Sequence, residues 1–267
     1  MAKSKNKKHH IILILLLLIA GIFFLVREFG KEKIPKVVPR KADKIAPKPI
    51  KPKAAVVIDD LGTNKDAANA VLKINAPLTL SILPQQPYTA WIAEEGHRLG
   101  RDVIAHIPME ASPPHDLGKG GLYTWMTDKE IAETLDYDIR SVPHLQGVSS
   151  HMGSAFTQDE RAMNVVISEL KKRRLFFLDS ITSPRSIGFN LAQKQGLKAL
   201  SRDVFLDDKD DPAGIEAQWK RFVSIADKKG HAILLAHPRE NTLKFLQKVL
   251  RGNDDVTVVP ISELVSR

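Results

Sequence analysis

Short apolar runs alternate with amphipathic segments along residues 54–267. The apolar runs are rich in β-branched residues, and between them apolar positions recur with the spacing of a helix. This alternation is typical of an α/β fold with parallel strands, because a parallel pair needs a crossover connection that is usually helical. We predict strands over residues 54–58, 78–83, 102–107, 147–151, 175–178, 197–201, 232–236 and 256–260. We predict helices over residues 65–74, 88–99, 128–140, 158–172, 186–195, 212–228 and 240–251.

Seven or eight strand–helix units fit into these 214 residues, and the segment contains no internal repeat. This number of units indicates one barrel-like domain. Two of the predicted helices begin with a capping box, in which a hydroxyl and a carboxylate satisfy the free amides of the first turn. The boxes are Thr127 with Glu130 and Thr157 with Glu160.

A different pattern precedes this domain. Four lysines within the first eight residues are followed by sixteen uncharged apolar or small residues, 11–26. At 1.5 Å per residue the run spans roughly 24 Å, and His9 and His10 or local thinning would let it cross the ~30 Å hydrocarbon core. The Phe-Phe-Leu-Val at 23–26 does not match the small residues at which a signal peptide is cleaved. We therefore predict an uncleaved signal anchor, with a cleaved signal peptide as the alternative.

Residues 27–53 contain five prolines and ten basic residues. Proline and like charge keep such a segment extended, and it cannot bury a core. We interpret it as a Lys/Pro-rich linker that holds the domain 54–267 away from a membrane. Seven of its basic residues follow the apolar run closely and oppose the inside-positive bias of the four lysines, so charge alone does not orient the span.

The net charge of +9 comes from the first fifth of the chain. Residues 1–53 carry +11 and residues 54–267 carry −2. A nucleic-acid-binding protein should carry its positive charge on the folded domain, so we expect no nucleic-acid partner. The chain has no cysteine, which excludes a disulfide scaffold, a thiolate zinc site, an iron–sulfur cluster and a cysteine nucleophile.

Residues able to bind a metal or transfer a proton follow five of the predicted strands. In parallel α/β folds and barrels the chemistry collects at the carboxyl ends of the strands, so we expect these residues to share one edge. They are Asp59 and Asp60, His106 with Glu110, His151, Asp179 with Ser180, and His237.

Each of these residues also has a structural interpretation. The pair Asp59 and Asp60 suits a turn or helix cap as well as a pocket in which one acid holds a cation and the other accepts a proton. His106 is either a buried, hydrogen-bonded histidine or a metal ligand, and His151 is either a loop histidine or a ligand. His237 is suited to donate a proton to a leaving group.

Other charged and aromatic residues lie near the same strand ends. Arg185 could bind an anionic or hydroxylated substrate, and Tyr123 and Trp125 beside a glycine-rich loop could stack on a sugar ring. As substrate-binding residues or as support for the site we name Asp179, Arg185, Arg202 and Asp203, with a structural ion pair as the alternative for the last two.

These residues resemble the motifs of the divergent polysaccharide deacetylases of bacteria, distant relatives of the metal-dependent carbohydrate deacetylases. The resemblance covers about residues 54–265 and implies a distorted (β/α)7 barrel. At the second histidine of the family's pair this chain has Glu110, and the Arg-x-Pro motif is replaced by residues 147–154, which include His151. The segments that carry the resemblance are Val57-Ile58-Asp59-Asp60, His106-Ile107-Pro108-Met109-Glu110 and Leu234-Leu235-Ala236-His237.

The resemblance implies metal-dependent hydrolysis of N- or O-acetyl groups on a cell-envelope polysaccharide or another glycan. Asp59 is then the general base and His237 the general acid. The resemblance also implies a divalent metal, for which we expect zinc, although the same ligands suit cobalt, nickel or manganese. The implied ligands are Asp60, His106, and His151 or Glu110. The alternative is a catalytically inactive, membrane-tethered glycan-binding or structural envelope protein on the same fold.

The family also implies a location in the cell envelope. We therefore expect a single-pass protein of the inner membrane. Residues 1–26 form a cytoplasmic basic tip and signal anchor, residues 27–53 the linker, and residues 54–267 a barrel domain in the periplasm. A cleaved and secreted form is the alternative.

Overall fold

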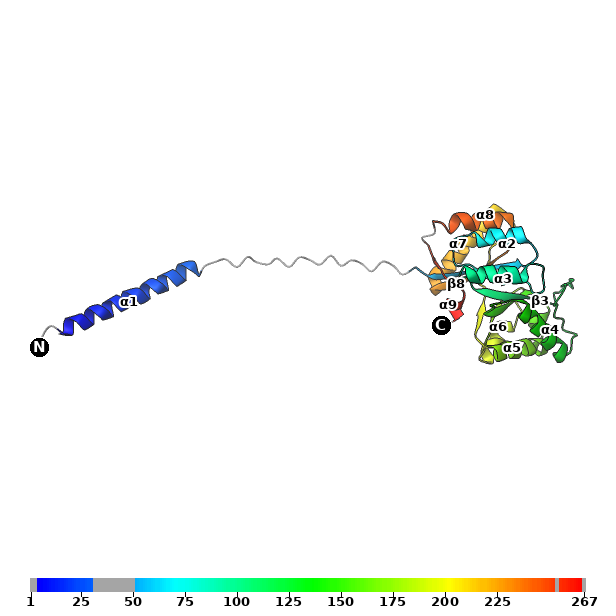
Figure 1. The fold of residues 1–267 in the computed structure, drawn as a ribbon, viewed down its shortest axis with the longest axis horizontal. Coiled ribbons are helices and arrows are strands. Elements are labelled where there is room, and N and C mark those ends of the chain that lie inside the picture. The colour runs from blue at the N-terminus through cyan, green and yellow to red at the C-terminus, as the bar shows by residue number, and fades with distance from the viewer. Residues whose placement is uncertain (1–3, 31–50, 253–254, 266–267) are drawn as a thin grey trace. The chain divides into compact units, whose positions relative to one another are not determined.

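Figure 1 shows the computed structural model, which describes residues 4–30, 51–252 and 255–265. Contacts divide the chain into two units, Met1–Lys48 and Pro49–Arg267. Most of the predicted linker, residues 31–50, lies outside the described residues.

The first unit contains helix α1, which runs from Ser4 to Phe29. Its stretch His9–Phe29 is long and apolar enough to cross a membrane. These 21 residues correspond to about 32 Å of helix, which matches a hydrocarbon core of ~30 Å without help from bilayer thinning. A signal sequence has the same length and composition, so α1 is a candidate for either role.

The second unit contains one parallel sheet. Nine strands are described, and they pair in the order β6-β5-β4-β3-β2-β1-β8-β7, with β9 pairing to β1. All of these pairs are parallel, so the predicted α/β class is confirmed. The strands are β1 Lys53–Leu61, β2 Thr79–Ile82, β3 Val103–Met109, β4 Gly147–Met152, β5 Phe176–Asp179, β6 Ala199–Ser201, β7 Val204–Phe205, β8 His231–Ala236 and β9 Thr257–Val258.

The sheet curls into a distorted barrel. The two ends of its pairing path, β6 and β7, are consecutive in the chain and are separated only by Arg202 and Asp203. One segment therefore pairs with β5 through its first half and with β8 through its second half. Strand β9 pairs only with the first two residues of β1 and is left out of the barrel. With the segment of β6 and β7 counted once, the barrel has the seven strands of the predicted (β/α)7 fold. The short strand β7 was not predicted, because two residues are too few for a recognisable apolar run.

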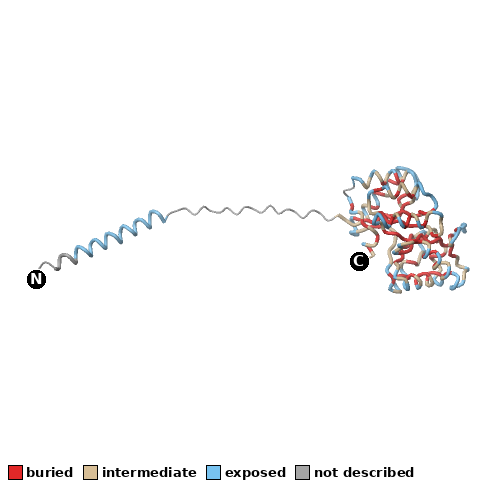
Figure 2. Tube along the Cα trace, in the orientation of Figure 1, coloured by how far each residue is buried: buried red, intermediate tan, exposed pale blue. Residues whose placement is uncertain are grey.

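Helices lie outside the sheet (Figure 1), and the strands are mostly buried, as the red parts of the tube in Figure 2 show. Apolar side chains pack on both faces of the sheet. Along β1, Val56 and Ile58 pack in the larger cluster with the helices, whereas Ala55 and Val57 pack in a smaller cluster with residues of β3, β5 and β8. Leu264 of the last helix belongs to this smaller cluster, so the carboxyl-terminal segment packs against the barrel interior. The helices are α2 Lys65–Leu72, α3 Thr89–Arg98, α4 Asp128–Ser141, α5 Glu160–Arg173, α6 Gly188–Lys194, α7 Pro212–Lys229, α8 Glu240–Val249 and α9 Ser262–Val265.

One of the two predicted capping boxes is present. At the start of α4 the Thr127 hydroxyl accepts from the amide of Glu130, whose carboxylate accepts from the amide of Thr127. The prediction of a box at Thr157 is wrong: this residue lies in the 3-10 turn Phe156–Gln158, and its hydroxyl donates to the carbonyl of Gly153. Asp159 caps α5 instead, with Oδ1 accepting from the amide of Ala162 at 2.8 Å.

Candidate active site and metal centre

A bulge at the end of β1 positions the two adjacent aspartates. The strand continues past the predicted end at Ile58 to Leu61, and its register with β2 shifts between these two residues. Asp60 has φ +58°, in the left-handed region that non-glycine residues rarely adopt. This local conformation breaks the alternation of a regular strand, so that Asp59 and Asp60 both lie near His106.

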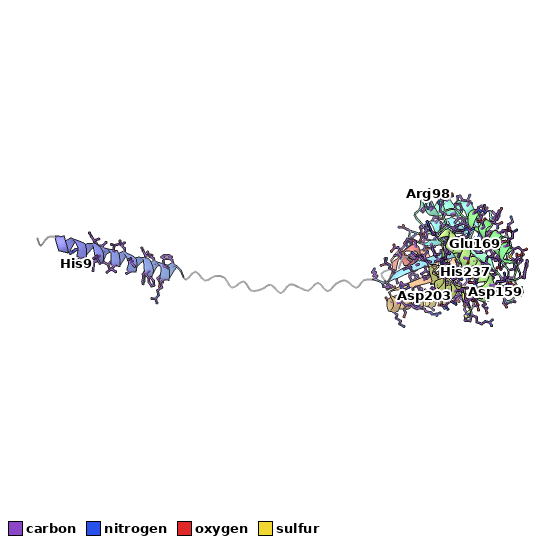
Figure 3. All side chains as sticks on the ribbon, turned by 90° about the horizontal axis from the view of Figure 1, so that it is seen from below. His9, Arg98, Asp159, Glu169, Asp203 and His237 are labelled. Carbon is purple, nitrogen blue, oxygen red and sulfur yellow. The ribbon has the colours of Figure 1, made fainter. Side chains whose placement is uncertain are left out.

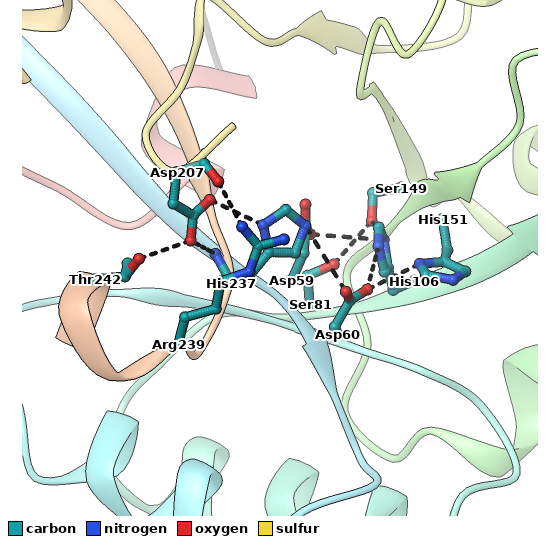
Figure 4. Close-up of polar contacts among 10 residues, drawn as sticks. All are labelled: Asp59, Asp60, Ser81, His106, Ser149, His151, Asp207, His237, Arg239 and Thr242. Carbon is teal, nitrogen blue, oxygen red and sulfur yellow. Dashed lines mark hydrogen bonds and ion pairs between the residues drawn. The ribbon is translucent and has the colours of Figure 1, made fainter. Parts of the chain in front are cut away.

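Asp60 is the centre of a cluster with two imidazoles (Figure 4). Its Oδ1 lies 2.8 Å from Nδ1 of His151 at the end of β4 and 3.3 Å from Nε2 of His106 in β3. One ligand atom from each of the three residues lies within 4.8 Å of the other two. Among the described residues, this is the one group of three or more histidines and carboxylates close enough to hold a metal ion.

The donor set of this cluster fits a divalent transition metal. Two imidazole nitrogens and a carboxylate oxygen are ligands typical of catalytic zinc sites, which leave a further position open. Burial alone would raise the pKa of Asp60, but hydrogen bonds and positive charge from His106 and His151 outweigh it and hold this pKa well below the usual range. Asp60 is therefore ionised at neutral pH, as a metal ligand must be.

Asp59 lies beside this cluster in a drier environment. It is 1% exposed, and its Oδ1 is 3.6 Å from Nδ1 of His106. Within the described part of the chain, this oxygen has no hydrogen-bond partner. Burial raises the pKa of Asp59, against the opposing effects of His106 and of a hydrogen bond from Ser81. A buried carboxylate with a raised pKa and a free oxygen is suited to accept a proton.

His237 follows β8 and approaches the second carboxylate oxygen of Asp60. Its Nε2 lies 3.7 Å from Oδ2 of Asp60, and its ring stacks on Phe205 at an interplanar angle of 16°. Its Nδ1 lies 2.9 Å from Oδ1 of Asp207, and its backbone amide donates to Oδ2 of the same residue. Burial disfavours the imidazolium, but the hydrogen bond and the charge of Asp207 outweigh it and raise the pKa of His237.

Asp207 is a site residue that the sequence analysis did not identify. Its side chain is fully buried, and Oδ2 also accepts from the hydroxyl of Thr242 at 2.8 Å. Asp207 follows the short strand β7 and lies six residues beyond the predicted strand 197–201. One feature of the sequence could have identified it: Asp207 comes two residues after the apolar pair Val204–Phe205, which forms β7.

Glu110 lies at the end of β3 but not in the metal-capable cluster. Its Oε2 accepts from the backbone amide of Thr124 at 2.7 Å and from the hydroxyl of the same residue at 2.6 Å. Of the two alternatives for the third ligand, the structure thus brings His151 to Asp60 and His106, while Glu110 holds the loop that follows β3.

Asp179 and Arg185 lie around a loop next to the barrel mouth. The Asp179 carboxylate is 1% exposed and accepts from the amides of Ile181 and Phe189 and from the hydroxyl of Ser186. These contacts give Asp179 the role of shaping the loop between β5 and α6. Arg185 is exposed on that loop.

Arg202 and Asp203 separate β6 from β7 but lie in different surroundings. Arg202 donates to the carbonyls of Ser180 and Ile181, and its guanidinium lies 4.1 Å from the centre of the Phe205 ring that stacks on His237. Arg202 therefore supports one wall of the site. Asp203 contacts Lys229 and the amide of Ile233, four residues before His237, and the structure does not bring it into the site.

The chain is thus a distorted parallel α/β barrel, and the carboxyl ends of its strands carry a metal-capable cluster with a buried aspartate and a histidine beside it. The chain belongs to the divergent polysaccharide deacetylase family, whose model matches residues 56–265. The resemblance drawn from the sequence motifs is thereby confirmed.

The chain is similar to several proteins across most of this region. It is 33% identical over 213 residues to an uncharacterized protein of Haemophilus influenzae, covering 79% of this chain and 76% of that protein. It is also 33% identical over 215 residues to the uncharacterized protein YibQ of Escherichia coli, covering 80% of this chain and 67% of YibQ. The crystal structure of the uncharacterized protein ATU2773 from Agrobacterium tumefaciens has a TM-score of 0.77 at 22% identity, covering 80% of this chain and 89% of that chain. At this identity the structural likeness shows a shared fold.

Proposed function

We propose that this protein is a metal-dependent hydrolase that removes acetyl groups from a glycan of the cell envelope. The observation that carries the proposal is that Asp60, His106 and His151 lie around one point, with Asp59 3.6 Å from His106 and His237 3.7 Å from Asp60. A hydrolase of this kind needs a cation, a proton acceptor and a proton donor at one carbonyl, and these residues supply the protein part of each.

The metal would be held by Asp60, His106 and His151, and we expect zinc. When bound, such an ion polarises a carbonyl and lowers the pKa of water. Oδ1 of Asp60 lies 2.8 Å from Nδ1 of His151 and 3.3 Å from Nε2 of His106. A cation bound there would therefore replace these polar contacts rather than enter an apolar pocket.

Asp59 would take the proton of the attacking water. Its free Oδ1 and its burial favour this role. A raised pKa makes a carboxylate a stronger base, so it accepts a proton from water more readily. His237 would give a proton to the departing amine or alkoxide. Its raised pKa keeps the imidazole protonated further into the neutral range, as a general acid requires.

A pair of aromatic side chains supports a glycan as the substrate. Tyr123 and Trp125 stack on each other with ring centres 5.3 Å apart, and Trp125 is 72% exposed. The loop that carries them is tied to the end of β3 by the contacts of Thr124 with Glu110. Exposed aromatic faces bind the apolar faces of sugar rings, and here they lie on a loop next to the strand that carries His106.

Helix α1 and the place where the linker joins the barrel support a proposal for the location. We propose that α1 anchors the chain in the inner membrane and that the barrel lies in the periplasm, with cleavage and secretion as the alternative. Strand β1 begins at Lys53 and carries Asp59 and Asp60 near its carboxyl end, so the linker joins the barrel at the end opposite the site. Tethering at that end would leave the site free to reach a polymer.

Acetate release tests the proposed function. Purified full-length protein loaded with zinc should release acetate from N-acetylated or O-acetylated glycan fragments. Asp59→Asn should lower the rate about 10²–10⁴-fold, the usual contribution of a general base, while leaving the metal content at the wild-type level. Asp203→Asn makes the same chemical change outside the site and should leave the rate within about twofold of wild type. Metal binding without acetate release from any of these glycans would favour the glycan-binding alternative.

A further inference from the structure

A basic pocket lies at the end of the barrel opposite the candidate active site. Because the strands are parallel, residues that precede β5 and β6 lie at the amino-terminal end, whereas Asp60 and His151 lie near the carboxyl ends. The pocket has a volume of about 440 Å³, within the usual range of ligand sites. Its lining comes mainly from the end of α5, the start of β5, the loop between α6 and β6, and α9.

The exposed part of the pocket lining is basic, and the more buried part is apolar. Lys171, Arg174 and Lys198 are exposed to solvent. The apolar lining residues are Leu175, Phe176, Leu197 and Val265. A phospholipid with an anionic headgroup has the two complementary parts, because its phosphate is joined through glycerol to apolar chains.

The three basic side chains keep their charge available to a ligand. None of them forms an ion pair within the described part of the chain, and Lys171 donates to the backbone carbonyl of Gln195 at 2.6 Å. The neighbouring Lys172 and Arg173 differ, because both pair with Glu169.

Two acids near the pocket are engaged in other contacts. The Asp102 carboxylate is 6% exposed and accepts from the side chain of Gln146 and the amide of Ser262, which both line the pocket. Glu263 of α9 forms an ion pair with Lys53 at 2.6 Å. The pocket therefore presents positive charge to solvent.

Helix stabilisation explains only part of this charge. A cation in the last turn of a helix offsets the helix dipole, and Lys171 lies in the last turn of α5. Arg174 caps this helix with φ +59°, a left-handed conformation that favours glycine, and α7 ends on Gly230 in the same conformation. Lys198 lies three residues beyond Gln195, the C-cap of α6. Arg174 and Lys198 thus place charge at the pocket that the helices do not require.

The position of the pocket indicates what its positive charge faces. Residues 54–267 carry a net charge of −2, so an anionic surface attracts this end of the domain rather than the domain as a whole. The chain enters the barrel at the same end, where β1 begins at Lys53. Anionic lipids attract basic side chains that lie within about a Debye length of the membrane surface.

We propose that the amino-terminal end of the barrel docks on the surface of a membrane that contains anionic phospholipids. Lipid phosphates bind Lys171, Arg174 and Lys198, and the glycerol region of one lipid contacts the apolar lining. The candidate active site then faces away from the membrane. This inference goes beyond the proposed function and requires neither the metal nor the acetyl chemistry.

The absence of cysteine allows docking to be measured with a single fluorescent label. Gln193→Cys places the label on the exposed side of α6 near the pocket, and Ser112→Cys places it on the exposed loop after β3, at the opposite end. Full-length protein is reconstituted in vesicles of phosphatidylcholine, with or without phosphatidylglycerol, that carry an acceptor dye on the headgroups. Phosphatidylglycerol should raise energy transfer from the label at position 193 but not from the label at position 112. No rise, or an equal rise at both positions, would overturn the inference.

Two triple variants test which basic residues are responsible. Lys171→Gln/Arg174→Gln/Lys198→Gln should lower the docking equilibrium about 100-fold, because each basic side chain at an anionic surface strengthens the attraction about fivefold. The control is Lys119→Gln/Lys129→Gln/Lys209→Gln, which makes the same change in net charge at exposed positions outside the pocket. It should leave docking within about twofold of wild type, because charges beyond a Debye length are screened. Equal docking of the two variants would overturn the inference.

Salt repeats the test without any substitution. Raising the ionic strength to about 1 M shortens the Debye length from ~8 to ~3 Å and should abolish the rise caused by phosphatidylglycerol. A rise that persists at this ionic strength would overturn the inference, even if the pocket variant did not fold. These measurements use neither zinc nor a glycan, so their failure and a failure of acetate release are distinguishable.

Discussion

Asp203 and Asp207 lie four residues apart and have different roles. Asp203 binds Lys229 and the amide of Ile233 near the start of β8, whereas Asp207 binds both the ring and the backbone amide of His237 beyond its end. Figure 3 labels Asp203 and His237. His237 lies beyond the carboxyl end of β8. Asp207 reaches that end and contributes to the site, whereas Asp203 lies near the start of the strand and does not.

Removing the charge of Asp207 should change the pH dependence of the proposed acetate release. Asp207 raises the pKa of His237, so Asp207→Asn should lower it, and the imidazole should lose its proton at a lower pH. The alkaline limb of kcat/KM should then move to lower pH by about one unit, the effect expected of a lost opposite charge. A pH–rate profile measures this shift. Asp203→Asn is the control, and an unmoved limb in Asp207→Asn would contradict the assignment of His237 as the acid.

At the level of single residues, the sequence predicted identities better than conformations. Asp59, Asp60, His106, His151 and His237 each follow an apolar run, and that position was enough to place them at one end of the barrel. No local pattern marks the left-handed backbone at Asp60. The contacts of Ser149 with Ser81 and His106 join strands that are distant in sequence, so no local pattern marks them either.

At the level of helices, the start of α5 shows how a cap is chosen. Thr157 and Asp159 both precede Glu160, but the turn at residues 156–158 draws the Thr157 hydroxyl back to Gly153 and leaves the cap to Asp159 (labelled in Figure 3). The sequence pattern was compatible with either residue, and the tertiary turn decided between them.

Loss of this cap should lower stability. Asp159→Ala removes the acceptor of the Ala162 amide and should reduce the free energy of unfolding by about 1 kcal/mol in urea titrations. Glu160→Ala is the control. It removes the carboxylate that the predicted capping box at Thr157 would have required, and it leaves the Asp159 cap in place. A larger loss for Glu160→Ala than for Asp159→Ala would contradict the cap described here.

Helix α4 carries a buried acid that should make stability depend on pH. Asp138 is fully buried, its Oδ1 accepts from Gln85 at 2.6 Å, and burial raises its pKa to about 7 from 3.8. The folded state therefore holds this proton between about pH 4 and pH 7, where the unfolded chain has lost it. The contribution of Asp138 to stability should fall as pH rises through this window, by up to about 1.4 kcal/mol per pH unit.

Asp138→Asn isolates this effect. The difference in free energy of unfolding between the variant and wild type should change steadily from pH 4 to pH 7 in favour of the variant and become constant above pH 7. Urea unfolding at several pH values measures it. A difference that does not vary with pH would contradict the raised pKa of Asp138.

For the whole molecule, the sequence pattern predicted the parallel α/β class and the family resemblance implied a seven-stranded barrel, but neither showed how the barrel closes. Alternating apolar and helical segments were enough for the parallel α/β order. The closing segment 199–205 contains two short strands that pair with different neighbours, and its only signal was the apolar residues on either side of Arg202 and Asp203. This irregular closure lies where Asp207 enters the site, which explains why Asp207 was missed.

We propose above all that Asp60, His106 and His151 bind one metal ion, close to Asp59 and His237. Anomalous diffraction from zinc-soaked crystals tests it most directly. We predict a single peak about 2.0–2.2 Å from an oxygen of Asp60, Nε2 of His106 and a ring nitrogen of His151. An absent peak at this position, or a zinc ion bound by Glu110 in place of His151, would contradict it.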